Sequence, residues 1–158
     1  MECLKTQRRL IEVGIEDIPD YLEIYNECRR TWKVYFPLIR RENLELLISS
    51  LPDYCLYAVE QDGIRLGYLL GYLHNYFGDD CVRIAHHETI MVSKLRCKSG
   101  YTIYKVTEML VDALIAWSKL MHAQRIVWST GTGNYRGLEH ILRIRNAEQI
   151  GIVLNMEL

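Results

Sequence analysis

Several features that mark particular classes of protein are missing from this sequence. The five cysteines, an odd number, form no Cys-x-x-Cys pair, which argues against a zinc site. No apolar run approaches the roughly 20 residues that a membrane-spanning helix needs. The net charge of −1 leaves no basic excess of the kind that nucleic-acid-binding domains usually carry. We therefore expect no bound metal, no membrane partner and no nucleic-acid partner.

The start of the sequence also lacks the pattern of a secretory signal. Residues 1–9 are charged and are not followed by an apolar segment. We therefore expect a cytoplasmic protein with reduced thiols. Of the 158 residues, 49% are hydrophobic and 25% are charged, which is typical of a globular domain with its own core. The length favours a single domain over residues 1–158, and we expect a monomer or a homodimer.

The spacing of apolar residues predicts the order of helices and strands. Recurrence every three to four residues predicts helices over residues 15–30, 41–50, 101–122 and 135–145. Short apolar runs between turn residues predict strands over residues 10–13, 54–60, 64–76, 82–92, 125–130 and 149–158. This order combines an antiparallel meander with a strand–helix–strand unit. We expect an α+β fold, with a mixed, mostly antiparallel central sheet and helices on both faces.

Glycines stand where turns or close contacts are expected. Asp62-Gly63 is the signature of a tight hairpin turn between two of the predicted strands. Gly67 and Gly71 lie inside the predicted strand 64–76, which indicates a bulge or a closely approaching neighbour.

The stretch from Ile84 to Tyr104 joins a predicted strand, a basic loop with one glycine, and a helix. A helix N-terminus exposes unpaired N–H groups and the positive end of the helix dipole, which favours a bound phosphate. Two titratable side chains, His86 and Glu88, precede the loop. An anion site beside acid–base groups indicates a phosphate-bearing cofactor and a proton-transfer reaction.

Side chains alternate along a strand, so the predicted strand 82–92 has two distinct faces. We expect one face to carry His86, Glu88, Ile90 and Val92. The other face is then expected to carry His87, Thr89 and Met91.

The element order and the junction together resemble the GNAT superfamily of acyl-CoA-dependent N-acetyltransferases. In that family the strand ends in an apolar residue, and the loop then reads Gln/Arg-x-x-Gly-x-Gly/Ala. Here the strand ends at Val92, and Gly100 stands at the first glycine. Cys97 replaces the Gln/Arg, and Thr102 replaces the second glycine. The divergent glycines and small size are similar to those of acetyltransferase-like proteins found in some phages.

The resemblance implies that acetyl-CoA binds along this junction. Family members splay two strands apart near the equivalents of Ile90 to Val92, where backbone groups would bind the pantetheine arm and polarise the thioester carbonyl. The N–H groups of the basic loop would approach the pyrophosphate. An Asn after the next strand is also typical of the family. The implied cofactor-binding residues are Ile90, Met91, Val92, Arg96, Cys97, Lys98, Ser99, Gly100, Tyr101, Thr102 and Asn134.

The resemblance further implies acetyl transfer to a primary amine by direct attack in a ternary complex. Family bases come from positions on this strand that align with His86 or Glu88. The alternative is that His86 is a core histidine and Glu88 a surface carboxylate. Ile141 stands where the family has its general-acid tyrosine. The remaining acid candidates are Tyr135, which could instead pack on the sheet, and His140.

Cys97 and its neighbours favour two further interpretations. A thiol at a helix N-terminus among cations is expected to have a lowered pKa, which would suit a nucleophile, although no His/Asp partner set is visible. The replacements at Cys97, Thr102 and Ile141, and Arg145-Asn146 in place of the usual Gly-Phe, favour a second hypothesis. In that hypothesis the protein is a catalytically degenerate binding or structural module with the same fold, for instance one encoded by a phage.

Overall fold

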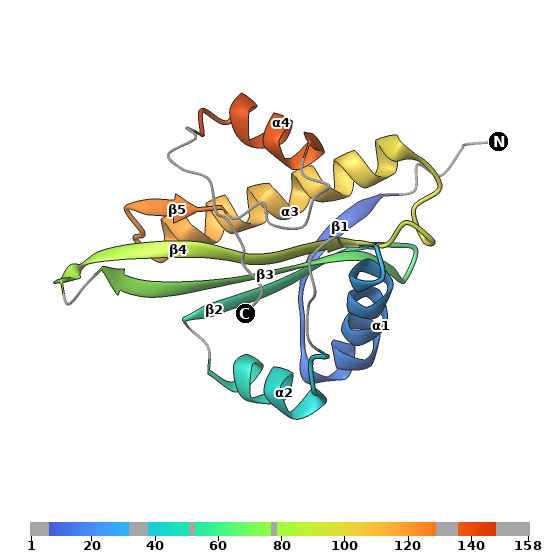
Figure 1. Cartoon of the computed structure of the whole chain (residues 1–158), viewed down its shortest axis with the longest axis horizontal. Helices are drawn as coiled ribbons and strands as arrows, with labels where there is room; N and C mark the ends of the chain where they lie inside the picture. The colour runs from blue at the N-terminus through green and yellow to red at the C-terminus, as the bar shows by residue number, and fades with distance from the viewer. Residues whose placement is uncertain (1–6, 32–37, 51–52, 77–78, 129–135, 148–158) are drawn as a thin grey trace, which may run out of the picture.

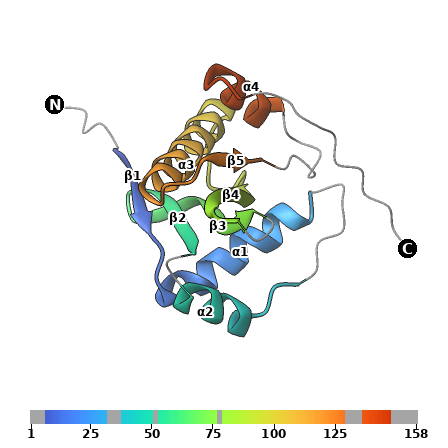
Figure 2. The same ribbon diagram turned by 90° about the vertical axis from the view of Figure 1, so that its left-hand side faces the viewer.

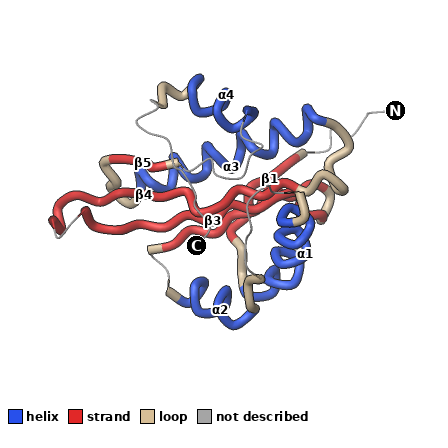
Figure 3. Tube along the Cα trace, viewed as in Figure 1, coloured by secondary structure: helices blue, strands red, loops and turns tan. Residues whose placement is uncertain are grey.

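The computed structural model describes residues 7–31, 38–50, 53–76, 79–128 and 136–147 (Figure 1). The strands are β1 (Arg8–Glu12), β2 (Tyr54–Gln61), β3 (Ile64–Tyr76), β4 (Asp79–Val92) and β5 (Arg125–Val127). A single 3₁₀ turn, η1 (Ile15–Asp17), precedes the first helix. The helices are α1 (Ile18–Arg29), α2 (Arg41–Ser49), α3 (Gly100–Leu120) and α4 (Arg136–Ile144), as Figure 3 shows.

The predicted elements are present wherever the structure describes their residues. The helix expected over residues 15–30 consists of the turn η1 followed by α1. Pro19 lies in the first turn of α1, where its missing N–H costs no hydrogen bond. Of the strand expected over residues 125–130, Arg125–Val127 form β5, and residues 129–130 lie outside the described residues. The final strand expected over residues 149–158 lies outside the described residues. The mixed, mostly antiparallel sheet with helices on both faces is confirmed.

The sheet has the strand order β1-β2-β3-β4-β5. The first four strands pair antiparallel, and β5 pairs parallel to β4 after the crossover through α3. The predicted hairpin turn joins β2 and β3, where Asp62 and Gly63 have φ angles of 54° and 78°. Positive φ at both central residues is the geometry that matches the twist of the flanking strands.

Helices cover the two faces of the sheet and bury a core on each side (Figures 1 and 2). On one face, α1 and α2 pack on residues such as Tyr68, Leu70 and Met91. On the other face, α3 packs on residues such as Leu69 and Leu73. No helix within the described ranges combines the length and the apolar character that crossing a bilayer requires.

Helix α3 is buried along a wider stripe than its sequence period predicts. Val106, Leu110 and Leu114 recur at helical spacing and are fully buried against the sheet. Val111, on the flank of that stripe, is also fully buried because Ile141 and Leu142 of α4 pack on it. The sequence of α3 alone does not reveal that a second helix covers this flank.

Gly67 and Gly71 allow α3 and β4 to approach β3 closely. A Cβ on Gly67 would lie 2.5 Å from the backbone oxygen of Met91 and 3.1 Å from Val106. A Cβ on Gly71 would lie 2.7 Å from Leu114 and 3.1 Å from the backbone oxygen of His86. The close neighbours that the sequence indicated are thus present at both glycines. The indicated bulge in β3 lies at Leu66, beside Gly67, because Gly67 pairs with Val59 and Arg65 pairs with Glu60. The register shift at Gly71 arises instead from an extra residue in β4.

We expect Gly67→Ala to lower the free energy of unfolding by about 1–3 kcal/mol, because the added methyl group presses on β4 backbone that cannot move aside. Gly137→Ala is the matched control, since its Cβ would meet nothing within 4 Å in α4 and alanine favours a helix. Urea unfolding followed by circular dichroism measures both variants. Equal stability of the two variants would contradict the close packing at Gly67.

Candidate functional site

Glu88 occupies a bulge in β4, directly upstream of the basic loop. Leu70 of β3 pairs with Thr89, whereas the next residue, Gly71, pairs with His87. Glu88 is therefore an extra residue with no partner position on β3. Bulges re-aim side chains and are enriched next to active sites. The Glu88 side chain is exposed at this irregularity.

The bulge makes the predicted division of β4 into two faces wrong in part. Beyond Glu88, Met91 lies opposite Tyr68 and belongs to the α1-side core. Ile90 packs instead toward α3, as does Val92. His86 stacks on its cross-strand partner Tyr72, so His86 and Ile90 do not share a face. The physical reason is that one inserted residue shifts the alternation of every residue that follows it.

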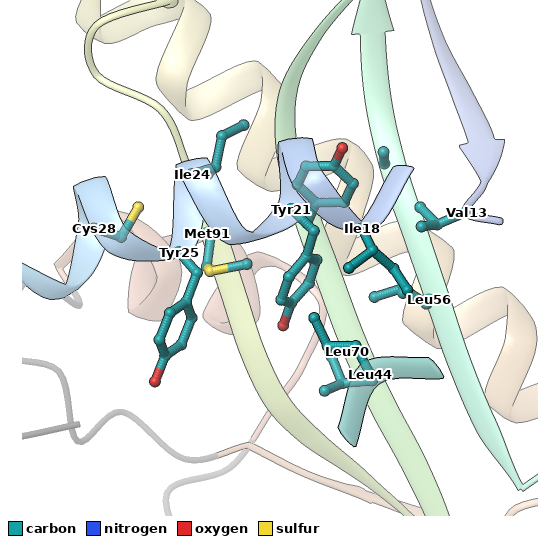
Figure 4. Packing of buried hydrophobic residues seen from close by; sticks show 12 residues of the cluster. Val13, Ile18, Tyr21, Ile24, Tyr25, Cys28, Leu44, Leu56, Leu70 and Met91 are labelled. Atoms are coloured by element: carbon teal, nitrogen blue, oxygen red, sulfur yellow. The ribbon is translucent and has the colours of Figure 1, made fainter. Parts of the chain in front are cut away.

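Three tyrosines surround the Glu88 carboxylate on the α1 side of the sheet. Burial is the main cause that raises the pKa values of Tyr21, Tyr25 and Tyr72, and the negative charge of Glu88 adds to each increase. The rings of Tyr21 and Tyr25 are stacked 6.5 Å apart. Figure 4 shows both hydroxyl groups pointing the same way, away from α1. Glu88 therefore faces a partly aromatic surface that α1 and β3 build together.

Two buried polar atoms on this side have no hydrogen-bond partner within the described part of the chain. They are the hydroxyl of Tyr21 and Nε2 of His86. The His86 ring lies 5.0 Å from the Tyr72 ring and 4.4 Å from the His74 ring. Burial, followed by the positive charge that His74 can carry, lowers the pKa of His86. The His86 imidazole is thus kept in its neutral form.

The described part of β5 pairs with only a short part of β4. The parallel pairing joins residues 84–86 of β4 to Arg125–Val127. Among the described residues, no strand pairs with this edge over residues 87–92. The chain that follows β5, residues 129–135, lies outside the described residues. The separation of strands that the resemblance implied near Ile90, Met91 and Val92 therefore stays a prediction, as does cofactor binding by their backbone groups.

The N-terminus of α3 is formed as the sequence predicts. Ser99 is the N-cap, and its Oγ accepts a hydrogen bond of 3.1 Å from the N–H of Thr102. Lys98, Gly100 and Tyr101 are exposed. A Cβ on Gly100 would meet nothing within 4 Å, so the space beside the first turn is open. The first turn of α3 is therefore uncovered on this side, and a helix N-terminus presents backbone N–H groups of the kind that bind phosphates.

The basic side chain of the loop, Arg96, is engaged by α1. Its guanidinium donates to Asp20 at 2.8 Å and pairs with Glu23 at 3.1 Å. It also donates to the backbone oxygen of Arg65 at 3.0 Å. This charge is therefore largely compensated within the protein. Its predicted part in cofactor binding is not tested by this arrangement.

The sequence interpretation missed the acidic side of α1. Asp20, Glu23 and Glu27 recur at helical spacing and all bind residues of the loop 93–96. The signal was present in the sequence, since carboxylates three and four residues apart share one side of a helix. Nothing in the sequence, however, indicated that this side would face the basic loop.

Cys97 does not have the activated thiol that the sequence suggested. The side chain is buried, and burial raises the pKa of the thiol, whereas the nearby charge of Arg8 lowers it only partly. The expectation of a lowered pKa is therefore wrong, because loss of hydration outweighs the local positive charge. Asn134 and Tyr135 lie outside the described residues, so their predicted roles remain untested.

The arrangement of strands and helices was compared with known proteins. An aminoglycoside acetyltransferase from an uncultured soil metagenomic sample has a TM-score of 0.71 at 12% identity, covering 96% of both chains. A ribosomal-protein-alanine N-acetyltransferase from Brucella melitensis biovar Abortus 2308 has a TM-score of 0.70 at 13% identity, covering 96% of this chain and 99% of that one. The chain has the GNAT fold.

A third structure with the GNAT fold is AAC(6')-Iy in complex with a bisubstrate analogue, CoA-S-monomethyl-acetylneamine. Its TM-score is 0.71 at 14% identity, covering 96% of this chain and 98% of that one. No family model and no curated protein matches the sequence. The likeness to these structures is therefore one of fold, and the sequence has diverged within it.

We expect His86 to titrate below its ordinary pKa of 6.5, because burial and then His74 disfavour the charged imidazole. The folded protein then binds fewer protons than the unfolded chain, so the free energy of unfolding falls as the pH drops below 6.5. NMR titration of the imidazole C–H signals measures the pKa. His86→Gln should weaken this loss of stability between pH 7 and 5. A His86 pKa at or above the ordinary value would contradict this account.

Proposed function

We propose that this protein is an N-acetyltransferase that transfers the acetyl group of acetyl-CoA to a primary amine by direct attack in a ternary complex. The observation that carries the proposal is the position of Glu88. Its carboxylate stands on a bulge, just beyond the part of β4 that pairs with β5 and upstream of the loop that leads into α3. This placement brings a proton acceptor close to Ile90 to Val92, with which no described strand pairs on the β5 side.

The residues around the junction fit acetyl-CoA as the acyl donor. No described strand pairs with Ile90 to Val92 on the β5 side, so their backbone N–H and C=O groups would be available to an extended pantetheine arm. The N–H groups of Gly100 and Tyr101 lie in the first turn of α3, and that of Thr102 is already capped by Ser99. The exposed Lys98 adds a positive charge beside this turn. Bound there, acetyl-CoA would supply an activated acyl group.

On the opposite side of the edge, the acceptor amine would lie between Glu88 and the tyrosines of α1 and β3. A carboxylate attracts the ammonium form and takes a proton from it, directly or through a water. The amine nitrogen then bonds to the thioester carbonyl carbon, the C–S bond breaks, and the thiol of coenzyme A is released. Neutral His86 is the second candidate base on the same side. Tyr135 remains the proposed acid for the leaving thiolate.

A second candidate function is a module with the GNAT fold that has lost catalysis. Specific observations favour it. Arg96 forms an ion pair with Asp20 of α1. Cys97 stands where the family has Gln or Arg, and Thr102 stands where it has glycine. Ile141 is fully buried against α3 and cannot replace the tyrosine usual in the family. Binding of acetyl-CoA without turnover would support this second function.

Acetyl-CoA should raise the melting temperature, because a ligand bound only by the folded state stabilises it. At a concentration about 100 times the dissociation constant, the expected gain is about 2.7 kcal/mol, or roughly 5–10 °C for a protein of this size. Differential scanning fluorimetry with acetyl-CoA, coenzyme A and inorganic pyrophosphate makes the measurement. No shift with millimolar acetyl-CoA would exclude the proposed acyl donor.

Glu88→Gln should lower the turnover of acetyl-CoA with an accepted primary amine by about 10²–10⁴-fold, with little change in acetyl-CoA affinity. Release of coenzyme A, detected with a thiol reagent across a panel of amines, measures turnover. His86→Gln tests the second base, and Glu12→Gln on the edge strand β1 is the control for a lost surface carboxylate. Unchanged turnover in both the Glu88 and the His86 variants would exclude these two residues as the general base.

A further inference from the structure

The carboxylate of Glu27 binds the start of the loop between β4 and α3. Its Oε1 accepts hydrogen bonds from the backbone N–H groups of Lys94, at 2.7 Å, and Leu95, at 3.2 Å. Its Oε2 accepts a hydrogen bond of 2.5 Å from the hydroxyl of Ser93. One side chain of α1 therefore satisfies three donors in consecutive residues of the loop.

Packing contributes little to the shape of this part of the loop. Leu95 is 86% exposed, and Lys94 is also exposed. Ser93 is the fixed point, since it is fully buried and its N–H donates to the backbone oxygen of Leu66. Beyond Ser93, the hydrogen bonds to Glu27 hold Lys94 and Leu95 in place, where hydrophobic packing is absent. Hydrogen bonds to a charged acceptor are stronger than those between neutral groups, which suits this task.

The bonds at Ser93 continue toward the N-terminus of α3. The Oγ of Ser93 accepts a hydrogen bond from the N–H of Arg96, and its backbone oxygen accepts one from the N–H of Cys97. Cys97 is followed by Lys98 and the N-cap Ser99. The orientation that Glu27 gives to Ser93 is thus carried to the turn where the pyrophosphate is proposed to bind.

We infer that Glu27 is a positioning residue for acetyl-CoA. It holds residues 93–95 in place, so that the N-terminus of α3 faces the cofactor. The inference rests on the proposed function, because it presumes that acetyl-CoA binds at this loop. In this role Glu27 acts without touching the cofactor. Its effect reaches the ligand through the backbone of the loop, so that a displaced loop would lose affinity.

The inference is tested on the full chain with three variants. Glu27→Ala removes all three hydrogen bonds. Glu27→Gln keeps an amide oxygen that can accept from both backbone N–H groups, and is the conservative replacement. Glu23→Gln is the matched control, since Glu23 is an exposed carboxylate on the same side of α1 that contacts only Arg96 of the loop. Isothermal titration calorimetry gives the dissociation constant for acetyl-CoA, and NMR gives amide hydrogen exchange.

We expect Glu27→Ala to weaken acetyl-CoA binding by roughly tenfold and to speed exchange at the amides of Lys94 and Leu95 by a similar factor. Glu27→Gln should recover most of the affinity, and Glu23→Gln should stay within about twofold of the original protein. If Glu27→Ala does not fold, a partial loss of acetyl-CoA affinity in Glu27→Gln supports the inference in its place.

The outcomes separate this inference from the proposed function. If the original protein binds acetyl-CoA and Glu27→Ala, folded, binds it equally well, the positioning role is overturned while the proposed function stands. Equal loss in Glu27→Gln and Glu23→Gln would also overturn it, since general charge would then be the cause. No binding by the original protein overturns the proposed function, and the positioning role with it.

Discussion

The extra residue in β4 is the constraint on which the geometry of the site depends. By inserting Glu88 opposite β3, the chain turns Thr89 and Met91 toward α1 and Ile90 toward α3. The same irregularity lies just beyond the last residues that pair with β5. The exposed carboxylate therefore lies within residues 87–92 of β4, with which no described strand pairs on the β5 side. A regular strand would have placed Ile90 beside His86 and left no such irregularity.

Helix α1 connects the two sides of this site. Its acidic side binds the loop through Asp20, Glu23 and Glu27, whereas Tyr21 and Tyr25 face the sheet near Glu88 (Figure 4). One helix therefore carries both sets, so the loop 93–96 and the surroundings of Glu88 are supported by the same element. The pairing with α1 also explains why the charge of Arg96 is not free to act on a ligand by itself.

Much of the fold could be predicted from periodicity, because each helix or strand buries a face whose spacing the sequence records. The helix α3 and the hairpin at Asp62-Gly63 are examples. The site could be predicted only as a region. Glu88 and His86 were identified as titratable residues on β4, but their surroundings depend on α1, which is about 60 residues away in sequence.

The sequence by itself determined the order of elements and the junction of strand, basic loop and helix, because these follow from local spacing and capping. The tertiary structure decided the rest at this junction. It placed Arg96 against α1 instead of leaving it to a ligand, and it buried Cys97 so that its thiol pKa rises. Burial and ion pairing depend on which elements meet across the fold, and a local pattern does not record those partners. The geometry of the junction from Ile84 to Tyr104 therefore depends in part on the carboxylates of α1, which lie far from it in sequence.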